Sequence, residues 1–205
     1  MSWKRAMLLL PLLAVLCACV EGGIRGSGIS TSVVGNVASV DPGGPGDLAG
    51  IRVTVAGSNR ATTTDAAGGF SLVGPFDGLL SVRFAPPGGG TAELPINVPA
   101  AGTLTLNNVA IDTARGTAVP ESQDVDFDGL VVSTDCAAGT MIMGSAVHTA
   151  GDADHYVVDL KTSVLEDSQG HQVPCDAVQS GAAATLSGHV DPAGTFGEAL
   201  IVLAP

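Results

Sequence analysis

Several residues of the segment DVDFDGLVVSTD, numbered 124–135, fall at the spacing of a calcium-binding loop. Asp124, Asp126 and Asp128 stand at loop positions 1, 3 and 5, and Asp135 stands at the closing position. Gly129 follows them at the position where such loops turn sharply. Carboxylate oxygens are the ligands that Ca²⁺ prefers in proteins, so the chemistry that this spacing offers is calcium binding.

The neighbouring residues nevertheless favour a strand over a loop. A calcium loop of this kind needs a helix after its ninth position, but the next residues, CAAGTMIMGSAV, are typical of a turn followed by a strand. Phe127 would place a bulky ring inside the loop, whereas Phe127, Gly129 and Val131 alternate as one face of a strand. We therefore predict a strand over this segment, a tight turn at Gly139 and no metal. The alternative is a calcium site formed by Asp124, Asp126, Asp128 and Asp135.

The remaining candidates for chemistry are weaker. The chain has four histidines, His148, His155, His171 and His189. Their spacing does not pair any two of them as metal ligands. The acidic segment GDADHYVVD (151–159) has the composition of a solvated hairpin tip. The sequence also lacks the Gly-x-Ser-x-Gly, His-Glu-x-x-His, phosphate-loop and dinucleotide motifs. We therefore predict no catalytic residue, no cofactor and no enzymatic activity.

The N-terminus has the pattern of an export signal. Lys4 and Arg5 precede an apolar run that is too short to span a bilayer. The run ends in LCAC, with Cys19 directly after the expected cleavage site, and this ending resembles the lipobox of bacterial lipoproteins. The resemblance implies a signal peptide over 1–18 and acylation of Cys19 with diacylglycerol and palmitate-type chains. Ordinary signal cleavage after Ala18 or Gly23 is the alternative.

The residues after Cys19 favour an outer-membrane destination. Val20 is not the aspartate that retains lipoproteins at the inner membrane in well-studied enteric bacteria. The Gly- and Ser-rich stretch that follows, within 19–29, predicts a flexible tether. We expect the protein to contact the membrane through its lipid anchor, on the periplasmic or the surface face, and to meet envelope proteins there.

Cys136 and Cys175 are the only cysteines after Cys19. In an exported chain, an even pair of cysteines predicts a disulfide. It would close a loop of about forty residues, which is worth roughly 4 kcal/mol in the chain-entropy model.

Composition and charge narrow the classes of protein further. The chain has 28 glycines, 12 prolines and short Val, Ile, Leu and Thr runs between turn residues, which predicts an all-β fold. Its net charge is −12, and Lys161 is the only lysine or arginine after Pro120. Because a surface this acidic repels phosphate backbones, we expect no nucleic-acid partner.

Residues 30–111 predict a first module of seven short strands. The strands are expected at 33–40, 51–55, 60–65, 69–73, 79–84, 93–98 and 103–111. The pattern Gly35-x-Val37, then Leu48-x-Gly50-Ile51-x-Val53-x-Val55, then Thr63-Thr64-Asp65-x-x-Gly68-x-Phe70-x-Leu72, resembles the carboxypeptidase regulatory-like, transthyretin-type family. The resemblance implies a prealbumin- or immunoglobulin-like sandwich and an accessory or adhesive role. In the turn TTDAAGGF, we expect Asp65 to cap backbone N–H groups and Gly68 or Gly69 to take positive φ.

Residues 112–123 are expected to form a linker, and residues 124–205 a second module. Its strands are predicted at 127–134, 140–147, 156–160, 171–175, 183–190 and 197–203. Leu186-x-Gly188-x-Val190, followed by DPAGTFGEALIVL, resembles the closing hairpin of a bacterial family of unknown function with a small OB-like β-barrel.

These features together predict a non-enzymatic, membrane-anchored envelope lipoprotein that serves as a structural or protein-binding β-module. The alternative is a cation-dependent binding module that binds calcium through the acidic C-terminal domain.

Overall fold

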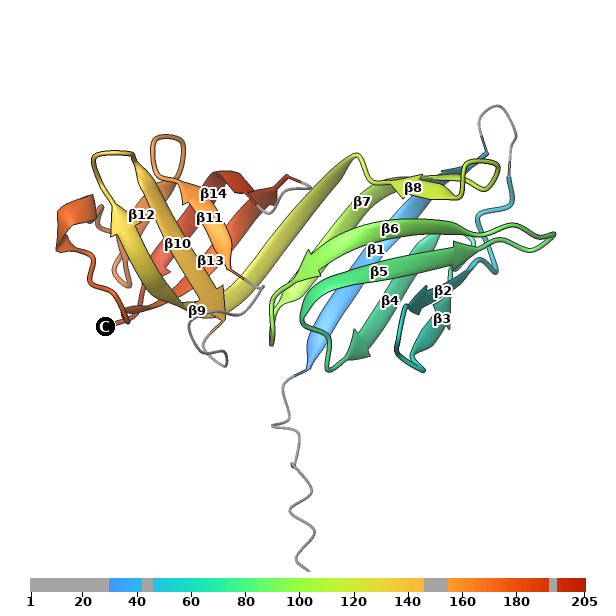
Figure 1. The fold of residues 1–205 in the computed structure, drawn as a ribbon, viewed down its shortest axis with the longest axis horizontal. Helices are drawn as coiled ribbons and strands as arrows, with labels where there is room; N and C mark the ends of the chain where they lie inside the picture. Colours follow the sequence, from blue (N-terminus) through green and yellow to red (C-terminus); the bar gives the residue numbers. More distant parts are fainter. Residues whose placement is uncertain (1–29, 42–45, 146–154, 192–194) are drawn as a thin grey trace, which may run out of the picture.

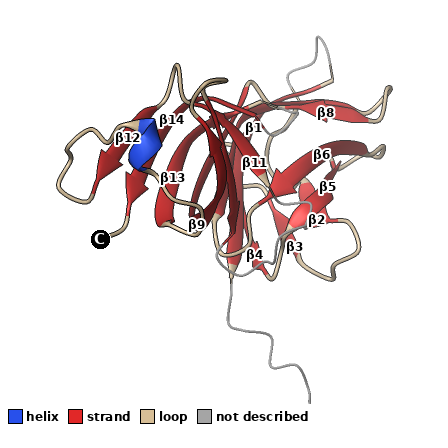
Figure 2. Cartoon of the chain, turned by 60° about the vertical axis from the view of Figure 1, so that its left-hand side comes forward, coloured by secondary structure: helices blue, strands red, loops and turns tan. Residues whose placement is uncertain are grey.

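The structure, a computed structural model, describes residues 30–41, 46–145, 155–191 and 195–205. Over these residues the fold is all-β, as predicted, with fourteen strands, one short 3₁₀ turn and no α-helix (Figure 2). The residues predicted to form the signal peptide and the tether, with the predicted lipidation residue Cys19, lie outside the described residues. So do His148, Asp152 and Asp154.

The first half of the chain has two facing layers of strands (Figure 1). In one layer β1 pairs with β4 and, in parallel, with β7; in the other, β5 lies between β2 and β6, and β3 pairs with β2. The short β8 pairs with β7 and meets β6 at one residue pair, Glu93 and Thr117. The bounds are β1 (Thr31–Val40), β2 (Arg52–Val55), β3 (Ala61–Thr63), β4 (Gly69–Gly74), β5 (Gly78–Ala85), β6 (Ala92–Val98), β7 (Thr103–Asp112) and β8 (Thr117–Val119).

Alternating apolar residues fill the space between these layers. Phe70 on β4 and Phe84 on β5 meet edge to face, with their ring centroids 5.7 Å apart. Val53 and Val55 on β2 are buried, as the period-two pattern predicted. Each layer therefore hides one face of its strands and leaves the other in solvent.

The motif residues of the first half fix the backbone conformation at a turn and at a close approach of two strands. Gly68 adopts φ +80°, and the Asp65 carboxylate accepts the N–H groups of Ala67 and Gly69 at 2.8 Å, which confirms the predicted turn. A Cβ on Gly35 would lie 2.3 Å from the carbonyl oxygen of Leu106, so only glycine permits this approach of β1 to β7.

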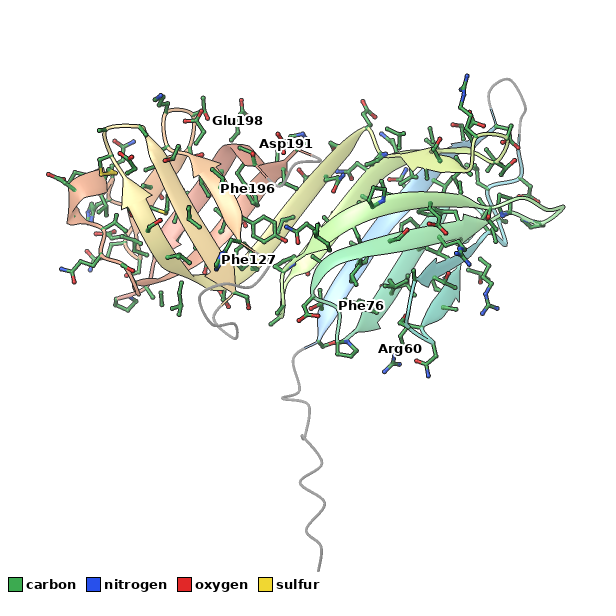
Figure 3. All side chains as sticks on the ribbon, in the orientation of Figure 1. Arg60, Phe76, Phe127, Asp191, Phe196 and Glu198 are labelled. Carbon is green, nitrogen blue, oxygen red and sulfur yellow. A yellow bond between two sulfur atoms is a disulfide. The ribbon has the colours of Figure 1, made fainter. Side chains whose placement is uncertain are left out.

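The second half contains a closed five-stranded barrel. The ladder runs β9–β10–β11–β14–β13 and returns to β9, while β12 pairs with the last residues of β14, beyond those that pair with β11. Phe127 and Phe196 come from different strands of the barrel (Figure 3). Both are buried, as is Tyr156, whose ring centroid lies 5.3 Å from that of Phe127 and 5.5 Å from that of Phe196. The bounds are β9 (Ser122–Asp135), β10 (Thr140–Ser145), β11 (Tyr156–Asp159), β12 (Val164–Asp167), η1 (Cys175–Ala177), β13 (Ala183–Val190) and β14 (Thr195–Leu203).

One predicted strand is wrong. Residues 171–175 form a single bridge and then enter η1, whereas the unpredicted β12 pairs in parallel with β14. Gly170 turns the chain with φ +80°, and Pro174, with no N–H to donate to a ladder, stands at the start of η1. β12 escaped prediction because its side chains lack a buried, alternating face.

β9 belongs to both halves of the molecule. One of its edges pairs with β7 over Ser122–Asp126 and then with β10 over Gly129–Asp135, while its other edge pairs with β13. The segment expected to be a linker, 112–123, accordingly contains β8 and the first residues of β9. Buried apolar residues of the two halves form one contiguous cluster. The division into two domains stays a prediction.

Candidate functional site

The predicted disulfide joins two parts of the second half. Cys136 lies in the turn between β9 and β10, and Cys175 begins η1, with their Cα atoms 5.7 Å apart. In the same turn Gly139 has φ +73°, and its N–H donates to the carbonyl of Asp135 at 2.8 Å. The disulfide therefore links the segment between β12 and β13 to the β9–β10 turn at the end of the barrel.

The aspartates of the calcium-like spacing lie on a strand, as predicted. Asp124, Asp126 and Asp128 line the outer face of β9, while Val125 and Phe127 between them are buried. Asp135 closes the strand, and its carboxylate accepts the N–H groups of the turn residues that follow.

This geometry does not bring the four carboxylates together. Alternate residues of a strand are about 7 Å apart, so Asp124 and Asp135 are separated by roughly 35 Å along β9. Ca²⁺ requires its oxygens at about 2.3–2.6 Å, and the loop that would gather them is absent from residues 124–135. Across the described part of the chain, no group of three or more His, Cys, Asp or Glu side chains could hold a metal ion.

The aspartates instead face hydroxyl, amide and imidazole groups on the neighbouring strands. Asp126 accepts a hydrogen bond from the Ser187 hydroxyl at 2.6 Å, and Asp128 accepts one from Thr185 at 2.7 Å. His189 Nδ1 lies 3.2 Å from Asp124, which also accepts from the Asn107 amide at 2.6 Å. Sequence reasoning missed this polar face because its partners lie on other strands: Asn107 on β7, and Thr185, Ser187 and His189 on β13, more than fifty residues away.

The polar face does not form a nucleophile–base pair. Serine catalysis needs the serine hydroxyl to donate to an imidazole, but the hydroxyl of Ser187 donates to Asp126 instead. The imidazole of His189 lies against Asp124 and is about half exposed. These contacts cross-link β9 and β13 at the surface.

A groove of about 450 Å³ opens where the two halves meet. Its walls come from the start of β6, from β8 with the first residues of β9, and from the end of β13. Apolar side chains line much of it, including Leu94, Val119 and Val190. No sequence motif indicates it, because three segments far apart in the chain build it.

The rim of the groove is acidic. Its lining includes Glu93, Glu121 and Asp191 but neither a lysine nor an arginine. Asp191 lies at the end of β13, beside the junction of the halves (Figure 3). Arg83 bonds to Glu93 at 2.6 Å, and its hydrogen bond and charge lower the pKa of that carboxyl below its ordinary 4.5. Glu93 therefore stays ionised near neutral pH.

Comparison with known proteins gives no family for this chain: no family model matches it, and neither does any curated protein. Within the described residues, the structure holds no helix that is long and apolar enough to cross a membrane.

Proposed function

We propose that the protein is a non-enzymatic lipoprotein of the cell envelope that acts as a structural and protein-binding β-module. The observation that carries the proposal is the basic, apolar leader that ends in LCAC, ahead of an all-β chain. Acylation of Cys19 would anchor it, because several acyl chains hold a protein to a bilayer far more firmly than one. The disulfide suits export, since disulfides persist in oxidising compartments.

The finer fold belongs to the same proposal. The first half would be a seven-stranded, carboxypeptidase regulatory-like sandwich formed by β1–β7, and the second half an OB-like barrel. Supporting this assignment, the glycines and Asp65 of the motif act on the backbone. Residues with such roles supply a fold and no chemistry, which agrees with a module that binds or supports other proteins.

The arrangement of the strands suits a spacer. The described chain enters β1 beside the first residues of β7, whereas β8 and the groove lie beside the last residues of β7 (Figure 1). Eight residues of strand separate these ends, a distance of about 27 Å. A membrane attachment through residue 19 would therefore enter the described fold at the end of β7 that lies away from β8.

The test is acylation in a bacterial host that expresses the full-length chain. Wild type should incorporate an alkyne palmitate analogue and fractionate with the outer membrane. Cys19→Ala should lose the label and become soluble or stay unprocessed. Cys17→Ala is the matched control, because it removes the neighbouring leader cysteine and should leave the label unchanged. Soluble, unlabelled wild type, or a labelled Cys19→Ala variant, would refute the anchor.

A further inference from the structure

The groove between the halves exists because the sheet splits there. β6 pairs with β5 along its whole length, but on its other side β8 reaches it at Glu93 alone. From Leu94 onward, no strand of the described chain pairs with that edge of β6. β8 and β9 meanwhile follow β7 away from β6, and the gap between them is the groove.

The open edge is poorly suited to accept another strand. The Glu93 N–H points across the gap and donates to the Gly116 carbonyl at 3.0 Å. Pro95, two residues along, faces the same edge and has no N–H to offer. A proline at an exposed edge blocks continuous strand pairing, so side-chain contacts rather than a backbone ladder must fill the groove.

The floor and the rim of the groove differ in character. Leu94 and Val190 are nearly buried in its floor, and Val119 stands 62% exposed in its wall. Covering an aliphatic side chain that is this exposed, beside other apolar groups in a groove, lowers the free energy of the complex. The rim adds the exposed carboxylates of Glu121 and Asp191. Each accepts a neutral N–H donor, from the Asn108 amide and the Thr195 backbone respectively, whereas Glu93 is paired with the cation of Arg83.

We infer that this groove binds an extended segment of a partner protein in which aliphatic side chains alternate with lysine or arginine. The aliphatic side chains enter the apolar floor, and the cations meet the acidic rim. A second copy of this chain is the wrong partner, because its net charge of −12 repeats the same sign. The inference deepens the proposed protein-binding role and does not depend on the lipid anchor.

The test uses fluorescently labelled seven-residue peptides titrated into the full-length protein in a neutral detergent, with binding followed by anisotropy. Three peptides separate the contributions: alternating lysine and valine, alternating lysine and serine, and alternating glutamate and valine. We expect the lysine–valine peptide to bind at least tenfold more tightly than either of the others. Micelles without protein set the background.

Two matched variants locate the site. Val119→Lys should weaken the binding of the lysine–valine peptide at least tenfold, because it places a cation in the groove. Leu79→Lys makes the same charge change at a side chain that is 74% exposed at the other end of the β5–β6 ladder, and it should leave binding unchanged. Glu121→Lys, at a second exposed rim position, repeats the test should Val119→Lys fail to fold.

Several results would overturn the inference. Equal binding of the lysine–serine peptide, or equal losses in Val119→Lys and Leu79→Lys, would mean general charge attraction. Absence of binding by all three peptides would exclude the site. A dimer that Val119→Lys converts to a monomer would make a second copy the occupant. None of these results affects palmitate labelling, so failure of the groove and failure of the anchor are distinguishable.

Discussion

On β9, Asp124, Asp126 and Asp128 alternate with buried residues, and each of these three carboxylates has a partner on a neighbouring strand. Asp126 and Ser187 are directly opposite in the β9–β13 ladder and are joined at 2.6 Å. Such an exposed cross-strand pair contributes a few tenths of a kcal/mol to about 1 kcal/mol. At the residue scale, the acidic face therefore stabilises a strand pairing only modestly.

The first prediction concerns calcium. Asp126→Ala should change the free energy of unfolding by about half a kcal/mol, as ordinary surface substitutions do. The melting temperature should be the same in about 1 mM calcium as in the presence of a chelator. A site with a dissociation constant a hundredfold lower would add about 2.7 kcal/mol and raise the melting temperature by several degrees. Such a rise, abolished by Asp128→Ala, would restore the calcium alternative.

A second prediction at this scale concerns the glycine that brings β1 against β7. In Gly35→Ala the new methyl would meet the Leu106 carbonyl oxygen at 2.3 Å, and the forced shift should destabilise the protein by about 1–3 kcal/mol. Gly197→Ala on β14 is the matched control, since no atom lies within 4 Å of its Cβ position. Chemical denaturation compares the two variants. Equal effects would show that the close approach carries no special requirement.

Among the elements, the stretch between β12 and β13 depends most on a covalent tie. It holds one three-residue 3₁₀ turn and no buried residue within that turn. The Cys136–Cys175 bond joins it to the β9–β10 turn across a sequence separation of 39. A cross-link of that span removes freedom from the unfolded chain more than it adds contacts to the folded one.

We predict that replacing both cysteines by serine lowers the free energy of unfolding by about 2–5 kcal/mol. A reductant should bring the melting temperature of wild type down to that of the double variant, and it should leave the double variant unchanged. Peptide mapping without reductant should recover the linked pair from exported protein. Two free thiols in that protein would contradict the bond.

The whole molecule is joined by β9 and by the packing at its junction. The Ser145 hydroxyl, buried at the end of β10, donates to the carbonyl of Ala100 in the first half at 3.2 Å. A Cβ on Gly102 would come within 2.7 Å of β9, so this loop lies directly against the barrel. Unfolding either half alone would break these contacts and leave part of β9 without its partner strand.

We therefore predict that the two halves unfold together. In a variant that lacks residues 1–18, and with them Trp3, Tyr156 fluorescence reports on the barrel, and far-ultraviolet circular dichroism reports on all strands. The two urea curves should coincide. Ile51→Ala, in the core of the first half, should cost about 2–5 kcal/mol and move both midpoints equally. A Tyr156 curve that does not move would show independent domains.

Local patterns were enough to predict much of the strand content and the turns. The strands of the first half were predictable because apolar and polar residues alternate along each of them. The turns at Asp65 and Gly139 were predictable because these residue types tolerate turn conformations. Phe127 decided between loop and strand in the same local way. The disulfide needed only two cysteines and no alternative partner.

Tertiary structure decided what depends on pairing between distant residues. Strand pairing is set by long-range register, so the sequence did not indicate that β9 changes partners from β7 to β10, or that β12 forms beside β14 while 171–175 does not. The groove has the same origin, because its three walls are adjacent only after β6 and β8 separate. A period of two residues tells which face of a strand is buried, but it carries no information about which strand lies beside it.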